Sequence, residues 1–98
     1  TAGTICEAAN LVIDRGAVDV IACATHGIFV GMAIDRIAES PISKVVITDT
    51  IVSRDDRSKI KGKLHELSVA RLLGEAIHRI HHDQSISAMF RTGVGTKR

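Results

Sequence analysis

The sequence predicts an α/β fold with a mainly parallel sheet, for two reasons. Two short, nearly continuous apolar runs contain several β-branched residues, which is typical of strands covered on both faces of a parallel sheet. Segments whose apolar residues recur at helical spacing alternate with these runs. The expected elements are a helix over 5–15, a strand over 18–24, a helix within 28–38, a strand over 44–48, a strand over 64–68 and a helix over 69–82.

The first helix is expected to begin at Thr4 and to stop at Gly16. Thr4 and Glu7 have the spacing of a capping box, in which each side chain bonds the other residue's backbone N–H. Glycine favours the left-handed conformation that ends many helices. The chain opens inside this turn, without a preceding strand or an initiator Met. We therefore expect it to be the C-terminal part of a longer protein, with a sheet that is incomplete at the N-terminus.

Polar residues follow the two apolar strands. Thr25, His26 and Gly27 come after the first strand, and Asp49 and Thr50 come after the second. In open α/β sheets, ligands bind beyond the carboxyl ends of the strands. His26 and Gly27 are therefore a candidate active-site loop, although a lone histidine is more often structural than catalytic.

The rest of the chain is more polar. Ser40 and Pro41 end the second helix. The segment 54–63 has charges of both signs and no apolar period, which is typical of a solvated loop. Ser68 is expected to cap the last helix, whose apolar side carries Val69, Leu72, Leu73, Ala76, Ile77 and Ile80. Residues 91–98 are expected to be a flexible tail.

The composition excludes several classes of function. The 98 residues suffice for one small domain or part of one. Phe29 and Phe90 are the only Phe, Tyr or Trp residues and the net charge is +2, which argues against a nucleic-acid partner. No apolar run approaches the roughly 20 residues of a membrane span. The two cysteines form no disulfide pattern, so we expect a reducing, cytoplasmic environment.

The first four residues, Thr1-Ala2-Gly3-Thr4, have the features of a phosphate site. Gly3 permits close approach of the backbone, Thr1 and Thr4 supply hydroxyls, and the positive end of a helix follows. The same residues also fit an ordinary capped helix start, which is a common pattern. The spacing alone leaves both interpretations open.

Three histidines crowd the end of the last helix. His78 and His82 are one turn apart and in a suitable position to share a metal ion, but only Asp83 lies nearby as a further ligand. His81 and its neighbours also interact favourably with the helix dipole. Cys6 lies in the first helical turn, where a thiol pKa can fall, but a structural role is the simpler interpretation. We therefore expect no metal ligand in this chain.

Several segments resemble, in order, the signatures of one family. They are 1–5 (TAGTI), 24–29 (ATHGIF), 46–51 (VITDTI), and 73–81 (LGEAIHRIH) followed by 85–90 (SISAMF). Together they resemble ribose-phosphate pyrophosphokinase, also called phosphoribosyl pyrophosphate synthetase. One such signature is weak evidence, whereas an ordered set over residues 1–90 is specific.

The resemblance implies a fold, a reaction and a site. Residues 1–90 correspond to part of the C-terminal domain, a Rossmann-like, phosphoribosyltransferase-type α/β domain. The implied enzyme is a cytoplasmic homohexamer that transfers pyrophosphate from ATP to ribose 5-phosphate. It requires Mg²⁺ and gives 5-phosphoribosyl 1-pyrophosphate and AMP for nucleotide biosynthesis. By the same resemblance, Thr1, Ala2, Gly3 and Thr4 bind the 5-phosphate of the sugar.

The resemblance also places parts of the machinery outside this chain. The family's acidic residues for the ribose hydroxyls, its flexible catalytic loop, most of its ATP site and its magnesium ligands lie upstream. Because this chemistry depends on positioning and charge neutralisation, the segment alone is expected to be inactive. Ser85, Ser87 and Phe90 resemble the region where the family binds regulatory phosphate or ADP between subunits.

The chain departs from the family at a few positions, which concern regulation rather than the fold. These positions are Val30, Met32, Asp49, Ala88 and Met89. The tail also differs.

Three other interpretations compete. A phosphoribosyltransferase uses a Thr-Gly-Gly-Thr-type loop, but Ala2 and the 25–27 segment argue against it. A non-catalytic regulatory subunit of the same family would keep the fold without the chemistry, and the upstream catalytic loop would decide between them. A purely structural domain does not account for the ordered set of signatures.

Overall fold

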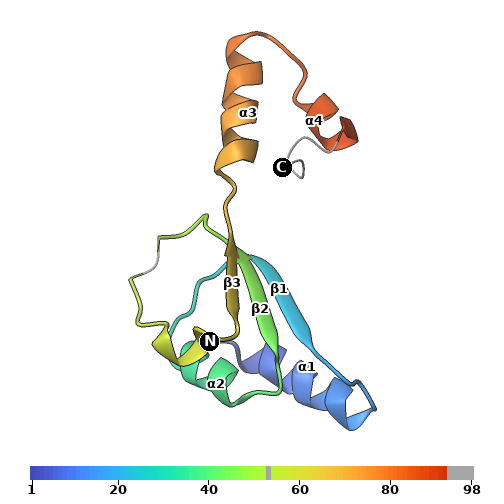
Figure 1. Cartoon of the computed structure of the whole chain (residues 1–98), viewed down its shortest axis with the longest axis vertical. Helices are drawn as coiled ribbons and strands as arrows, with labels where there is room; N and C mark the ends of the chain where they lie inside the picture. Colours follow the sequence, from blue (N-terminus) through green and yellow to red (C-terminus); the bar gives the residue numbers. More distant parts are fainter. Residues whose placement is uncertain (53, 93–98) are drawn as a thin grey trace. The chain divides into compact units, whose positions relative to one another are not determined.

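The structure is a computed structural model that describes residues 1–52 and 54–92. It divides into two compact units, Thr1–Leu67 and Ser68–Arg98. The first unit contains α1 (Gly3–Asp14), β1 (Ile21–His26), α2 (Ala33–Glu39), β2 (Lys44–Thr48), the 3₁₀ helix η1 (Ser58–Ile60) and β3 (Leu64–Leu67) (Figure 1). The second contains α3 (Ala70–His81) and α4 (Ser87–Thr92). Arg91 therefore belongs to α4 and not to a tail, and 93–98 lie outside the described residues.

The three strands form one parallel sheet in the order β1-β2-β3, which confirms the predicted α/β class. Ala22 pairs with Val45, and Val45 pairs with Leu64. Within the described residues most of β1 is exposed, so the prediction that the first strand is covered on both faces stays a prediction. There β1 has β2 as its hydrogen-bonded neighbour, and Ala22 is its buried residue. An apolar run indicates a strand but does not define its place in a sheet.

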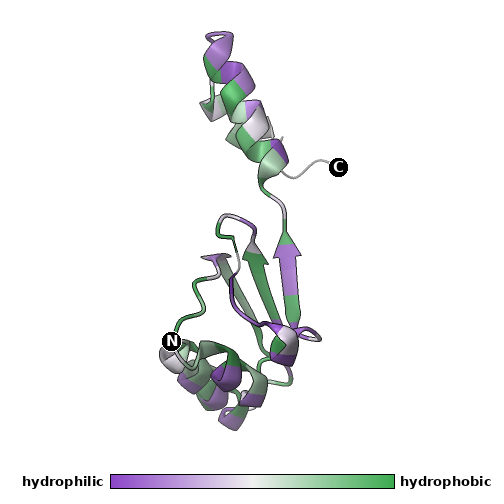
Figure 2. Ribbon diagram, turned by 90° about the vertical axis from the view of Figure 1, so that its left-hand side faces the viewer, coloured by the Kyte–Doolittle hydropathy of each residue, from purple (hydrophilic) through white to green (hydrophobic). Residues whose placement is uncertain are grey.

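One face of the sheet carries the core of the first unit. Along β2, the buried Val45 and Ile47 alternate with Val46 and Thr48, which are partly exposed. This alternation shows that one face of the strand is covered, and the residues that share its buried cluster come from α1, α2 and η1. The core residues are Cys6, Ala9, Ala22, Ile37, Ile42, Val45, Ile47 and Ile60. Figure 2 shows the hydrophobic colour of β2 and the hydrophilic middle of β3.

The start of α1 differs from the prediction, whereas its end agrees. Thr4 is not the N-cap, because the helix already begins at Gly3 and its N-cap is Ala2, at φ 62°. In the described chain no side chain caps this end, so the capping box does not form. At the other end Gly16 adopts φ 103° and donates to the Ile13 carbonyl, as expected for a helix stop.

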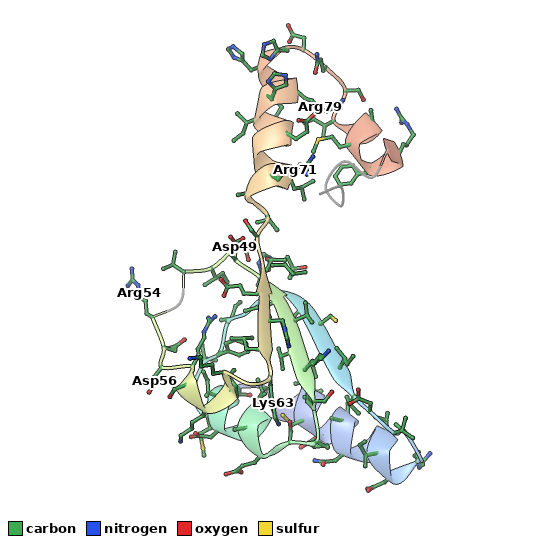
Figure 3. All side chains as sticks on the ribbon, in the orientation of Figure 1. Asp49, Arg54, Asp56, Lys63, Arg71 and Arg79 are labelled. Atoms are coloured by element: carbon green, nitrogen blue, oxygen red, sulfur yellow. The ribbon has the colours of Figure 1, made fainter. Side chains whose placement is uncertain are left out.

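The charged segment 54–63 is not simply a solvated loop. Lys63 lies close to α2 (Figure 3), and its Nζ donates to the carbonyls of Ile37 at 2.9 Å, Ala38 at 3.3 Å and Ser40 at 3.0 Å. A cation at this point satisfies the last carbonyls of α2 and complements its dipole. Lys59 donates to Asp35 at 2.6 Å, and this bond raises the pKa of Lys59.

In the second unit, α3 forms almost as predicted. Its N-cap is Val69, and Ser68 contributes by accepting the Ala70 N–H at 3.2 Å. Asp83 takes the left-handed conformation at φ 53° and ends the helix. The expected apolar side is present but not buried within this unit, where Leu73, Ile77 and Ile80 are more than half exposed. Among residues 1–52 and 54–92, no helix has the length and apolar character needed to cross a bilayer.

Candidate functional site

The beginning of α1 is an opening lined by backbone N–H groups. The first helical hydrogen bond runs from the Cys6 N–H to the Ala2 carbonyl at 3.1 Å. The N–H groups of Gly3, Thr4 and Ile5 therefore have no partner within the helix. Ala2 is left-handed and Gly3 is helical, and such a reversal of hand forms a concave nest for anions. A non-glycine residue in this conformation costs about 1 kcal/mol or more, so its surroundings must hold it.

A polar hollow of about 440 Å³ adjoins this turn. Its lining residues are Thr1, Gly3, Thr4, Cys6, Glu7, Asn10 and Arg36. Arg36 comes from α2, and its Nη1 donates to the Thr1 carbonyl at 3.1 Å. Sequence reasoning missed Arg36, because it is a charged residue on a short helix far along the chain from Thr1. Only the packing of α2 beside α1 could reveal it.

A second, mostly apolar hollow of about 210 Å³ brings the two predicted loops together. Thr1 and Ala2 line it from one side, and His26, Gly27 and Phe29 line it from the other. It lies at the carboxyl end of β1, where ligands of open α/β sheets bind. The two candidate loops are thus neighbours in space.

His26 is the last residue of β1 rather than part of the following loop. Its Nδ1 is hydrogen-bonded to the Thr50 Oγ1 at 2.7 Å. Thr48 Oγ1 donates to the Thr25 carbonyl at 2.6 Å. These bonds join the ends of β1 and β2, so His26 has a structural role whatever its role in catalysis.

Arg57 supports the loop after β1 from the charged segment. Its Nη2 donates to the Gly27 carbonyl at 3.3 Å, and its Nη1 pairs with Glu66 at the same distance. The guanidinium carbon lies 4.9 Å from the centre of the Phe29 ring, a cation–π contact. Arg57 Nε is buried without a hydrogen-bond partner in the described structure. These contacts could not be predicted from the sequence, since Arg57 stands among charged residues that are expected to be solvated.

The remaining predicted residues lie elsewhere. Cys6 is buried in the core, as the structural interpretation expects, and both cysteines are free thiols. The rings of His78 and His82 are 4.3 Å apart, and His82 Nδ1 bonds the His78 carbonyl at 2.8 Å. In the part of the chain that the structure describes, no three His, Cys, Asp or Glu side chains are grouped to hold a metal ion.

The regulatory candidates belong to the second unit. Ser85 and Ser87 are exposed, and the Ser85 carbonyl accepts from Arg79 Nη1 at 3.0 Å. Phe90 is 73% exposed, while Met89 beside it is buried. Figure 3 shows Arg79 on α3. The unit therefore presents two hydroxyls and an aromatic ring to solvent.

Comparison with known proteins identifies the family. Residues 1–91 match the family described as the phosphoribosyl synthetase-associated domain. The chain belongs to this family. The resemblance read from the residues is thereby confirmed, since the phosphoribosyl synthetase-associated domain covers nearly the whole chain.

Two relatives of this chain are named ribose-phosphate pyrophosphokinase. The chain is 49% identical over 90 residues to a ribose-phosphate pyrophosphokinase of Aquifex aeolicus, covering 92% of this chain and 28% of the relative. It is 52% identical over 91 residues to one of Rhodopirellula baltica, covering 93% of this chain and 28% of that protein. The chain thus spans between a quarter and a third of the length of these relatives.

A solved structure agrees with the fold. The phosphoribosylpyrophosphate synthetase of Mycobacterium smegmatis superposes with a TM-score of 0.79 and 37% sequence identity. The match covers 85% of this chain and 27% of that one. The α/β fold of the phosphoribosyl synthetase-associated domain is therefore shared with that synthetase.

Gly27→Ala is expected to destabilise the protein by about 1–3 kcal/mol, because overpacking forces neighbouring side chains to move. A Cβ at position 27 would lie 2.5 Å from Ile47 Cδ1 and 3.2 Å from Phe29 Cε2. Urea unfolding measures the change. Gly62→Ala is the control, since a Cβ there meets nothing within 4 Å. Equal stability of the two variants would contradict the packing of Gly27 against β2.

Proposed function

We propose that the intact protein containing this chain is a ribose-phosphate pyrophosphokinase. It transfers the pyrophosphoryl group of ATP to the anomeric hydroxyl of ribose 5-phosphate, giving 5-phosphoribosyl 1-pyrophosphate and AMP. The chain supplies the loop Thr1-Ala2-Gly3-Thr4, which binds the 5-phosphate of the sugar. The chain alone is inactive, because the catalytic loop and most of the ATP site belong to the part of the enzyme that precedes it.

The observation that carries this proposal is the geometry at the start of α1. The left-handed Ala2 and the free N–H groups of the first helical turn are suited to a phosphate group. The loop lies in one of the segments that match the family, and relatives at about half identity carry the pyrophosphokinase name. The hollow between this loop and His26–Gly27 is then the place for the sugar.

We assign the Mg²⁺ ions of the reaction to residues outside this chain. This assignment rests on the resemblance to the family, whose magnesium ligands lie upstream of the loop. The metal would neutralise the charge of the ATP phosphates. The contribution of this chain is to bind and orient the sugar phosphate with backbone N–H groups. We further propose that the enzyme is a cytoplasmic homohexamer, and two free thiols agree with a reducing compartment.

Formation of AMP by the intact polypeptide tests the function. With ATP and Mg²⁺, AMP is expected to appear only when ribose 5-phosphate is added. If ribose 5-phosphate binds but no AMP forms, the protein is a non-catalytic regulatory subunit. If the protein instead releases pyrophosphate from 5-phosphoribosyl 1-pyrophosphate with a nucleobase, it is a phosphoribosyltransferase.

Gly3→Val is expected to raise the KM for ribose 5-phosphate in the intact enzyme by about tenfold or more, the loss expected for a disturbed charge-assisted hydrogen bond. A Cβ on Gly3 would lie 3.3 Å from Arg36 Nη1 and 3.8 Å from Thr1 Oγ1, so a valine narrows the hollow. The KM for ATP should change little. Gly62→Val in open space is the control. An equal rise of the KM values for ribose 5-phosphate and ATP would count against the loop assignment.

We also propose that Ser85, Ser87 and Phe90 belong to a regulatory site for phosphate or ADP. Ser87→Leu should weaken ADP inhibition or phosphate activation by about fivefold, equivalent to about 1 kcal/mol. The reason is that leucine removes a hydroxyl from the exposed start of α4. Effector titrations of the intact enzyme measure the shift, and the rate without effectors should be retained. Unchanged titrations would remove this segment from the regulatory site.

A further inference from the structure

Arg36 touches the proposed phosphate loop at two points. Its Nη1 donates to the Thr1 carbonyl at 3.1 Å. The same nitrogen lies 3.3 Å from the position of a Cβ on Gly3, and the guanidinium carbon lies 4.0 Å from it. The two helices involved, α1 and α2, lie side by side in Figure 1 and are in direct contact. The guanidinium group therefore lies against the backbone on both sides of Ala2.

Most of the hydrogen-bonding capacity of Arg36 remains available. A guanidinium has five N–H donors. In the described part of the chain, Arg36 makes one hydrogen bond, to Thr1, and no ion pair. Glu7 also lines the hollow, but no ion pair joins it to Arg36 in that part of the chain. The remaining donors border the polar hollow beside Thr4.

We propose that Arg36 is a positioning and specificity-determining residue of the phosphate loop. It holds the strained turn at Ala2 through the Thr1 carbonyl, and its free N–H donors select a phosphate group on the sugar. The planar guanidinium suits this role because it binds phosphate with two parallel hydrogen bonds, whereas an ammonium acts as a point charge. This inference rests on the proposed function, since it concerns the same sugar-phosphate site. It adds a side-chain cation to a site otherwise built from backbone N–H groups and hydroxyls.

The test compares Arg36→Gln and Arg36→Lys with wild type in the intact polypeptide. Arg36→Gln should raise the KM for ribose 5-phosphate by about 10- to 100-fold, the range for lost charge-assisted bonds. The KM for ATP should stay within about twofold. Arg36→Lys should raise the KM for ribose 5-phosphate less than Arg36→Gln does, because lysine keeps the positive charge but lacks the planar guanidinium that forms two parallel hydrogen bonds. Arg15→Gln is the matched control, an exposed arginine at the far end of α1.

A second measurement separates phosphate recognition from a merely structural role. Calorimetry gives a preference, the ratio of the Kd for ribose to the Kd for ribose 5-phosphate. Arg36→Gln should lower this preference by the same factor by which it raises the KM for ribose 5-phosphate. An unchanged preference, or an equal rise of both KM values, overturns the inference. Should Arg36→Gln fail to fold, Arg36→Lys decides: a raised KM for the sugar phosphate at wild-type melting temperature supports the inference, and a wild-type KM overturns it.

The outcomes distinguish this inference from the proposed function. A wild-type polypeptide that forms no sugar-dependent AMP defeats the pyrophosphokinase proposal, and the calorimetric preference still tests Arg36. A wild-type polypeptide that forms AMP, together with an Arg36→Gln variant of unchanged preference, defeats only the inference about Arg36.

Discussion

The packing of α1 and α2 on one face of the parallel sheet determines the architecture of the first unit. Ala9, Ile37 and Ile47 meet in that layer and are each about 2% exposed. Burial of one large aliphatic side chain contributes about 1.5–3 kcal/mol. An ion pair exposed to solvent, such as Lys59–Asp35, contributes much less, because water and salt screen its charges. The apolar layer therefore dominates, and it determines where the start of α1 lies.

That placement creates the candidate site. Because α1 starts beside the carboxyl end of β1, Thr1 and Ala2 line the same hollow as His26 and Gly27. Because α2 packs beside α1, Arg36 reaches the Thr1 carbonyl. The site thus combines backbone dipoles, which are fixed by the helix, with one cation from a neighbouring helix. Such preorganised groups suit binding and orientation of an anion, which is the role proposed above for this loop.

The charged segment 54–63 also holds elements that border the candidate site. Lys63 ends α2 by satisfying three carbonyls, and Arg57 braces the loop after β1 through the Gly27 carbonyl and the Phe29 ring. Residues that look like solvated charges in the sequence therefore hold the helix and the loop that border the site. Arg54 and Asp56, on the same segment (Figure 3), are exposed. Charge alone does not distinguish residues that make such contacts, Lys63 and Arg57, from those that are exposed.

The α/β class, the approximate elements and the family could be predicted from the amino-acid sequence. Short apolar runs, helical spacing and a glycine stop at Gly16 are local signals, and the ordered signatures over residues 1–90 are specific. The sequence also predicted a phosphate loop at 1–4, which stays a prediction. The predicted capping box was wrong, since the N-cap of α1 is the left-handed Ala2, two residues before Thr4. Local patterns describe residues that are neighbours along the chain.

Contacts between residues that are distant along the chain could not be predicted. The bond from His26 to Thr50, the bond from Arg36 to Thr1 and the bond from Arg57 to Gly27 each join residues more than twenty positions apart. Such contacts depend on how helices and strands pack. A single sequence contains no periodic signal for such contacts. A charged or polar residue that faces water cannot be told in the sequence from one that contacts a neighbouring helix or strand.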